Sequence, residues 1–261
     1  MTSIIRDANF LHPLSDPPDG KLVGRKFELD LLEEFIVKNR RNVFVFGKAG
    51  VGKTSVVKLF LSKLSGMSGL KAVYVNAGET RSPYYTLQKI AAALGVDVPP
   101  SGWQMSKLKQ LFEKARGSAR LVIAIDEVDA ILNKQREPLV YYLNRLPDTT
   151  LILISNKIQD LAKLPPRAKS SLQAFPLPFE SYSDAEFKEI LAARASKALA
   201  PGSFSDEQLA RIARAMNLIG DVRIAFNVLL SSSFFAERQG KSQFDSDAIE
   251  RGANAAVEGI R

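Results

Sequence analysis

The 261-residue sequence contains no cysteine and a single histidine, His12. The absence of thiols excludes disulfides, thiolate zinc sites and cysteine nucleophiles. His12 lies in a proline-rich N-terminal stretch, so we interpret it as a surface residue and not as a catalyst. No apolar run approaches the length of a membrane span, and the N-terminus has no signal-peptide pattern. We therefore expect a cytoplasmic protein with no membrane partner.

Composition and charge describe a globular chain with a basic bias. Hydrophobic residues make up 46% and charged residues 25% of the sequence, which is typical of a globular protein of one large or two small domains. The net charge of +8 favours polyanionic partners such as nucleic acid. The lysines and arginines are scattered and not clustered, so a merely solubilising surface stays open as the alternative.

A glycine-rich stretch gives the strongest signal in the chain. The residues from Gly47 to Thr54 read GKAGVGKT and match G-x-x-x-x-G-K-[ST], the phosphate-binding loop. They follow an apolar run typical of a buried strand, Val43 to Phe46, and precede a helical pattern, which is the context that the motif requires. Glycines let backbone N–H groups close around a phosphate, and the helix adds its positive N-terminal end.

Two side chains of this loop have the chemistry to handle a nucleotide. Lys53 would reach the β- and γ-phosphates, and Thr54 would offer its hydroxyl to Mg²⁺. The predicted nucleotide-binding residues of the loop are Gly47, Lys48, Ala49, Gly50, Val51, Gly52, Lys53, Thr54 and Ser55.

Carboxylates follow a second apolar run. The run from Leu121 to Ile125 reads LVIAI and leads directly into Asp126 and Glu127. Because ligands bind at the carboxyl ends of parallel strands, we expect Asp126 to hold Mg²⁺ and Glu127 to orient and polarise the attacking water. The alternative is that these are ordinary loop acids. We prefer that interpretation for Asp129, which is expected to cap the next helix.

Strand and helix patterns alternate over the first two thirds of the chain. Further strands are expected at Lys71 to Asn76, Leu151 to Ile154 and Ala174 to Phe179, and an amphipathic helix from Phe27 to near Asn39. This alternation predicts the α/β class, with a parallel sheet flanked by helices.

Two polar residues after the fourth strand are candidates for the site. Asn156 would position the lytic water or touch the γ-phosphate, although a lone asparagine there is more often a turn residue. Arg167, in a loop after two prolines, is either solvated or presented to the nucleotide of a neighbouring subunit.

The last third of the chain has purely helical patterns. We predict an extended arm over residues 1–20, an α/β domain over 21–180 and a small helical lid over 181–261. Ser183 with Glu186, and Ser205 with Gln208, have the spacing of capping boxes, and Asp221 is a plausible N-cap. The helix dipole disfavours a cation at Arg223, two residues later, so a nucleotide phosphate is expected to supply an anion there.

Five motifs occur in an order and spacing that resembles the AAA+ ATPases: GKAGVGKT, LVIAIDEVD, LILISN, LPPRAKSSL and GDVR. More narrowly, the chain resembles the origin-recognition and cell-division-control initiators of archaea and eukaryotes. The narrower resemblance is carried by LVGRKFE, by VYVNAGETRSPYYTLQKIAAALG and by PRAKSSL followed by FESYSDAEFKEIL. It covers about Leu22 to Val257.

The resemblance implies a role for each matching residue. Lys53 and Thr54 would belong to Walker A and Asp126 and Glu127 to Walker B. Asn156 would be sensor 1, Arg167 the arginine finger and Arg223 sensor 2, and Leu22 and Val23 would lie near the adenine. Such a protein would be a slow ATPase that binds ATP or ADP and Mg²⁺ and assembles with other AAA+ subunits or with itself.

The resemblance also implies DNA as a partner. The segment from about Pro83 to Leu94 corresponds in part to an initiator insertion that resembles a DNA-contacting element. Initiators usually continue into a winged-helix domain, which is not found before Arg261, so we expect weak binding to the backbone of double-stranded DNA. The cations expected to contribute are Arg81, Lys89, Lys107, Lys109, Lys114 and Arg116. Two alternatives stay open: a transposition regulator or clamp-loader subunit, and a nucleotide-locked interaction module with little turnover.

Overall fold

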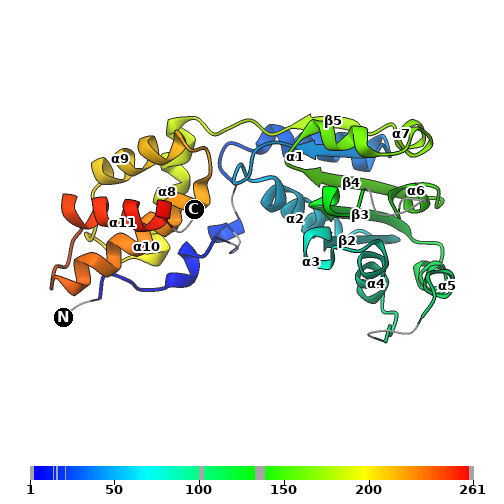
Figure 1. Ribbon diagram of the computed structural model, residues 1–261, viewed down its shortest axis with the longest axis horizontal. Helices are drawn as coiled ribbons and strands as arrows, with labels where there is room; N and C mark the ends of the chain where they lie inside the picture. Colours follow the sequence, from blue (N-terminus) through cyan, green and yellow to red (C-terminus); the bar gives the residue numbers. More distant parts are fainter. Residues whose placement is uncertain are drawn as a thin grey trace. The chain divides into compact units, whose positions relative to one another are not determined.

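A computed structural model describes residues 3–13, 15, 17–20, 22–99, 103–132 and 139–258. Lys21, the predicted first residue of the α/β domain, lies outside them. The chain forms two compact units (Figure 1). The sheet unit consists of Phe27–Gly47 and Lys53–Phe179, and the helical unit consists of Met1–Lys26, Lys48–Gly52 and Glu180–Arg261.

The sheet unit is built on five parallel strands. Their order across the described sheet is β2-β3-β4-β1-β5, and every pairing is parallel. The neighbouring inner strands β3 and β4 are largely apolar and buried on both faces, as expected of a parallel sheet covered by helices. This confirms the predicted α/β class. The strands are β1 (Val43–Phe46), β2 (Leu70–Asn76), β3 (Arg120–Asp126), β4 (Thr149–Ser155) and β5 (Phe175–Pro178).

Helices pack on this sheet at several places. The helices α2 and α4 contact β2, α6 contacts β4, and α4 packs against α5. The helical segments of the unit are α1 (Lys26–Leu32), η3 (Glu33–Lys38), α2 (Lys53–Leu64), α3 (Ala77–Thr80), α4 (Pro83–Ala93), α5 (Met105–Arg116), η4 (Val128–Ala130), α6 (Leu139–Asn144), η5 (Ile158–Lys163) and α7 (Pro166–Leu172).

The first predicted helix differs from expectation in its buried face. Phe27 was expected on the apolar face but is 71% exposed, whereas Leu32 and Ile36 are fully buried. The buried positions are Glu28, Leu32 and Ile36, which are four residues apart, so Phe27 lies one position off the buried face. The expectation for Phe27 is therefore wrong.

Two further local predictions are wrong. Arg167 does not lie in a loop but in the first turn of α7, where Pro166 is tolerated because the first N–H groups of a helix have no partner within it. Asp129 does not cap a helix; it lies inside η4, whose N-cap position is Glu127, and its carboxylate accepts a hydrogen bond from Ser155 at 3.2 Å.

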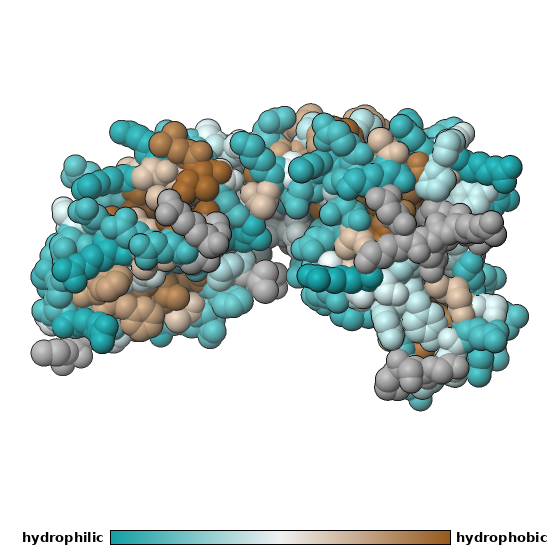
Figure 2. Space-filling view, in the orientation of Figure 1, coloured by the Kyte–Doolittle hydropathy of each residue, from teal (hydrophilic) through white to brown (hydrophobic). Residues whose placement is uncertain are grey.

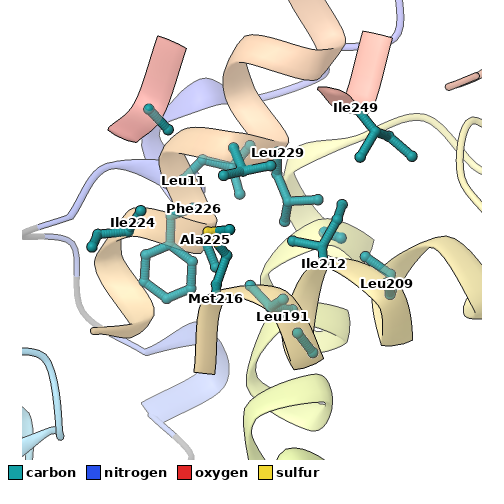
Figure 3. Packing of buried hydrophobic residues seen from close by; sticks show 14 of the residues in the cluster. Leu11, Leu191, Leu209, Ile212, Met216, Ile224, Ala225, Phe226, Leu229 and Ile249 are labelled. Atoms are coloured by element: carbon teal, nitrogen blue, oxygen red, sulfur yellow. The ribbon is translucent and has the colours of Figure 1, made fainter. Parts of the chain in front are cut away.

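The helical unit has a core of its own (Figure 3). Its main helices are α8 (Asp184–Ala198), α9 (Asp206–Asn217), α10 (Val222–Arg238) and α11 (Ser246–Glu258). Both predicted capping boxes are present, at Ser183 with Glu186 and at Ser205 with Gln208. Asp221 is the N-cap of α10, as predicted, and accepts from the backbone N–H of Arg223.

The N-terminal segment belongs to this helical core. Ile4 and Leu11 are buried among the helices, and Ile5 forms an antiparallel bridge with Leu199. Arg194 of α8 donates to the carbonyls of Phe10 and Ser15 at 3.0 and 2.7 Å. The prediction of an extended arm is thus incomplete: the segment includes the short 3₁₀ helices η1 (Ala8–Leu11) and η2 (Pro18–Gly20), and His12 is exposed as expected.

The face shown in Figure 2 is mostly hydrophilic, with apolar areas visible on the helical unit. Among the described residues of that unit, the exposed large apolar side chains are Leu218, Ile219 and Phe234. Within the described part of the chain, no helix is both long and apolar enough to cross a bilayer.

Candidate nucleotide-binding site

The phosphate-binding loop joins β1 to α2, as its sequence context predicts. Gly47 directly follows β1 and lies close to the end of the neighbouring strand β5. A Cβ atom at position 47 would lie 2.3 Å from the Phe179 carbonyl oxygen. Only glycine fits that approach. The residues Lys48–Gly52 group with the helical unit, and Lys53, Thr54 and Ser55 form the first turn of α2.

Lys53 links the loop to the end of a neighbouring strand. Its ammonium group donates to the Gly47 carbonyl at 2.7 Å and to the Asn156 side-chain oxygen at 3.0 Å. Lys53 is only 7% exposed, so its charge is held in place at the edge of the sheet. Strands β1 and β4 are neighbours with parallel register, which brings residues 47 and 156 to the same edge.

Thr54 and Asp126 meet directly. The Thr54 hydroxyl donates to Oδ2 of Asp126 at 2.6 Å, and the backbone N–H of Glu127 donates to Oδ1 at 2.8 Å. Asp126 is 5% exposed, and these donors satisfy the oxygens of a carboxylate that is largely withdrawn from water.

The Asp126 carboxylate has one more partner, which sequence reasoning missed. Tyr74 of β2 donates its hydroxyl to Oδ2 of Asp126 at 2.9 Å. Burial, together with the negative charge of Asp126, raises the pKa of Tyr74 above its ordinary value, so the phenol keeps its proton and remains a donor. The alternation in KAVYVN places Tyr74 on one face of the strand. The sequence pattern is the same for a tyrosine that is only buried and for one whose hydroxyl binds a carboxylate, so it gave no signal for this contact.

Glu127 is exposed and has an unusual backbone conformation. Its φ angle is +48°, in the left-handed region that non-glycine residues rarely adopt. Its carboxylate approaches the start of α3 so closely that a Cβ atom on Gly78 would lie 1.8 Å from Oε2. The exposed carboxylate of Glu127 thus stands next to the buried carboxylate of Asp126. Such strain is often found at functional sites.

A second polar cluster holds the end of β4. The Ser155 hydroxyl lies 2.5 Å from Oδ2 of Asp160, and Lys163 pairs with the same carboxylate at 2.6 Å. Burial of Asp160 acts to raise its pKa, but the hydrogen bonds from Lys163 and Ser155 outweigh burial and hold the pKa below its ordinary value. The cluster therefore fixes the strand end that presents Asn156.

The remaining predicted residues lie apart from this cluster or in the other unit. Arg167 is exposed on α7 of the sheet unit, and Leu22 and Val23 are half-buried in the helical unit. Arg223 pairs with Asp221 at 2.5 Å in the helical unit. The N-cap of α10 thus places an anion beside Arg223, and the expectation that a nucleotide phosphate lies near Arg223 stays a prediction.

The cations predicted to contact DNA differ in their availability. Arg116 is 8% exposed and so is not part of the basic surface, and Lys89 pairs with Glu79 at 2.8 Å. Lys107 of α5 lies over the Trp103 ring with its nitrogen 4.6 Å from the centroid.

The residues at the sheet edge fit ATP with Mg²⁺. A hydroxyl and a carboxylate are oxygen ligands of the kind that Mg²⁺ prefers, and Lys53 supplies a fixed positive charge. Across the described residues no group of three or more histidine, cysteine or acidic side chains could hold a metal. Mg²⁺ at nucleotides is usually bound by one or two protein oxygens together with waters and substrate phosphates.

Two protein-family models match the chain. Residues 36–158 match an AAA domain, and residues 188–254 match the Cdc6 AAA+ ATPase-type lid domain.

Curated proteins and solved structures that are similar to this chain point to the same kind of protein. The chain is 32% identical over 221 residues to ORC1-type DNA replication protein 1 of Sulfolobus acidocaldarius, covering 80% of this chain and 56% of that protein. It is 29% identical to the ORC1-type DNA replication protein of Desulfurococcus amylolyticus, covering 98% of this chain and 69% of the relative. A solved structure of the Aeropyrum pernix ORC1 protein in complex with DNA is 28% identical with a TM-score of 0.85, covering 100% of this chain and 71% of that chain. The crystal structure of Cdc6p from Pyrobaculum aerophilum has a TM-score of 0.83 at 20% identity, with 97% and 72% covered, and shows the fold alone.

The five-stranded parallel sheet, the phosphate-binding loop and the helical lid define the class of AAA+ ATPases. Within that class the chain belongs to the origin-recognition and cell-division-control initiator family, which confirms the resemblance read from its motifs. It spans 56% of the length of the first two curated relatives.

Proposed function

We propose that this chain binds ATP with Mg²⁺, hydrolyses it slowly, and uses its nucleotide state to control assembly on DNA as a replication initiator. The observation that carries this proposal is the convergence at one sheet edge of Thr54 with Asp126 and of Lys53 with Asn156, at 2.6 and 3.0 Å. These contacts join the phosphate loop to the ends of two other strands.

The chain's own residues divide the binding chemistry. Lys53 would bind the β- and γ-phosphates, and Thr54 and Asp126 would hold the metal. Mg²⁺ held by these residues would supply positive charge to offset the negative charge of the phosphates. Leu22 and Val23 would contact the adenine.

Hydrolysis needs a positioned water and positive charge. Glu127 would orient and polarise the water, and Asn156 would position it or contact the γ-phosphate. Arg223, and Arg167 from a neighbouring subunit, would offset charge in the transition state. The exposure of Glu127 and Arg167 supports these roles, because both side chains are accessible to a partner outside the unit that carries them.

DNA and AAA+ subunits are the proposed macromolecular partners. The Aeropyrum pernix ORC1 structure contains DNA, and the curated relatives are replication proteins, which favours an initiator over a transposition regulator or clamp-loader subunit. Of the predicted cations, Lys107, Lys109 and Lys114 on α5 remain suited to phosphates. Net charge +8 gives the attraction, which is weak and directed at the backbone.

One observation favours the nucleotide-locked alternative. The Arg223 guanidinium already pairs with Asp221 at 2.5 Å, and a neutralised cation stabilises a transition state less. If this pair persists with ATP bound, the chain would bind nucleotide tightly and turn it over little.

Two variants test the proposal. Lys53→Ala should weaken ATP binding because Lys53 contacts phosphate in the ground state. Glu127→Gln should retain ATP affinity and lower the hydrolysis rate, because Glu127 acts on water. Binding of a fluorescent ATP analogue and phosphate release measure the two effects separately. Equal losses of affinity in both variants would contradict the assigned roles, and parental binding without turnover would select the nucleotide-locked alternative.

A further inference from the structure

Asp126 has an additional side-chain donor that no role assigned above accounts for. The hydroxyl of Tyr74 and the hydroxyl of Thr54 both donate to Oδ2 of Asp126, at 2.9 and 2.6 Å. We propose that Tyr74 is a positioning residue of the magnesium site, and that its phenol holds the Asp126 carboxylate in the orientation that faces Thr54. This inference rests on the proposed function.

The distribution of donors around the carboxylate supports this role. An ionised carboxylate has about four lone-pair sites, and three are taken by Tyr74, Thr54 and the backbone N–H of Glu127. Thr54 is itself assigned to the ion through its hydroxyl oxygen. Tyr74 is thus the side-chain donor on Oδ2 that is not committed to the metal, and it leaves Asp126 one lone-pair site for the ion or a water bound to it.

The placement of Tyr74 is fixed by strand pairing. In the parallel register of β2 with β3, Tyr74 pairs with Ala124, and Asn76 pairs with Asp126. Tyr74 and Asn76 are two residues apart and so lie on the same face of the sheet. Lys58 of α2 lies over the tyrosine ring, with its nitrogen 4.8 Å from the centroid, and holds the ring from a second element.

The substitution Tyr74→Phe tests the contribution of the hydroxyl independently of that of the ring. Tyr74→Phe keeps the aromatic packing and the contact with Lys58 but removes the bond to Asp126. The chain offers a matched control in Tyr142 of α6, whose hydroxyl donates to Glu113 at 2.7 Å in the same unit. Tyr142→Phe removes one bond from a half-buried phenol to a carboxylate at a place that has no part in the site.

The test measures Mg²⁺ dependence and not turnover. The full chain binds a fluorescent ATP analogue at fixed concentration while Mg²⁺ is titrated, and a parallel titration of the analogue is made in EDTA. Removing a residue that hydrogen-bonds to a metal ligand typically lowers metal affinity by about 10- to 100-fold. Tyr74→Phe should raise the Mg²⁺ concentration for half-maximal effect by roughly that factor, with unchanged analogue affinity in EDTA. Tyr142→Phe should match the parent in both titrations, and melting temperatures check that all three proteins are folded.

Each other outcome decides against the inference in a distinct way. A parental Mg²⁺ requirement in Tyr74→Phe overturns it and leaves the proposed function intact. Equal losses with and without Mg²⁺, or the same change in Tyr142→Phe, assign Tyr74 a structural role and also overturn it. A parent whose analogue binding shows no dependence on Mg²⁺ refutes the proposed function, and the inference with it.

Discussion

Replacing Asp221 tests whether the ion pair in α10 restrains Arg223. The Asp221 carboxylate accepts from the backbone N–H of Arg223 at 3.0 Å and pairs with its guanidinium at 2.5 Å. It is therefore both a helix cap and a counter-ion. Asp221→Asn keeps a side-chain oxygen for the cap and removes the charge, whereas Asp221→Ala removes both.

The structure sets the size of the two effects on stability. The Arg223 side chain is 42% exposed, and a pair in such a position is worth about 0.2 to 1 kcal/mol. Loss of an N-cap costs about 1 kcal/mol. Asp221→Asn should therefore lower the free energy of unfolding by less than about 1 kcal/mol, and Asp221→Ala by roughly 1 to 2 kcal/mol.

Nucleotide binding should respond in the opposite direction. If Arg223 contacts nucleotide phosphate, freeing it from its counter-ion should raise affinity for ATP, by about fivefold for 1 kcal/mol of pairing released. Both variants should show this gain, although their stabilities differ. Denaturant unfolding and titration with a fluorescent ATP analogue measure the two quantities. Unchanged affinity in Asp221→Asn would refute the reasoning, because Arg223 would then not be limited by Asp221.

Two further predictions concern partners. Arg167→Ala should leave the ATP affinity of the dilute protein unchanged and abolish any rise in ATPase rate with protein concentration. Mixing this variant with Lys53→Ala should restore activity, because some interfaces then combine one intact site with one intact arginine. If activity does not recover, and the parent shows no concentration dependence, Arg167 is a solvated residue. Replacing Lys107 and Lys109 together should weaken duplex DNA binding alike for all sequences and flatten the slope of log K against log salt by about one for each lost phosphate contact. A salt titration with ATP present measures this, and identical slopes in parent and double variant would contradict a phosphate contact.

The features that were predictable from the sequence are those with a local physical cause. A strand that is buried on both faces needs a continuous apolar run, and the run from Leu121 to Ile125 predicted such a strand in a parallel sheet. The capping boxes at Ser183 and Ser205 are equally local, since the bonds span three residues. The two motifs were expected to lie together at the carboxyl ends of the strands, and the structure joins them by a hydrogen bond from Thr54 to Asp126.

The features that were missed depend on residues far apart in the chain. Tyr74 meets Asp126 through strand register, which the periodicity of one strand does not encode. Ile4 and Leu11 are isolated apolar residues with no helical or strand period, so their burial in the helical core left no signal. Arg223 is a local exception, because its counter-ion Asp221 stands only two residues earlier and was considered only as a helix cap.

The anchoring of the N-terminal segment in the helical unit has a consequence for how the chain folds. Ile5 bridges to Leu199, and Glu237 accepts from the backbone N–H groups of Ile4 and Ile5, so the N-terminal residues need partners that are synthesised after the sheet unit. The sheet unit lies between them in sequence. Closing this long loop costs entropy, and completing the helical core is a late step during synthesis because Leu199 and Glu237 are made after the sheet unit. Deleting residues 3–11 should accordingly slow or prevent that last step while the sheet unit still folds.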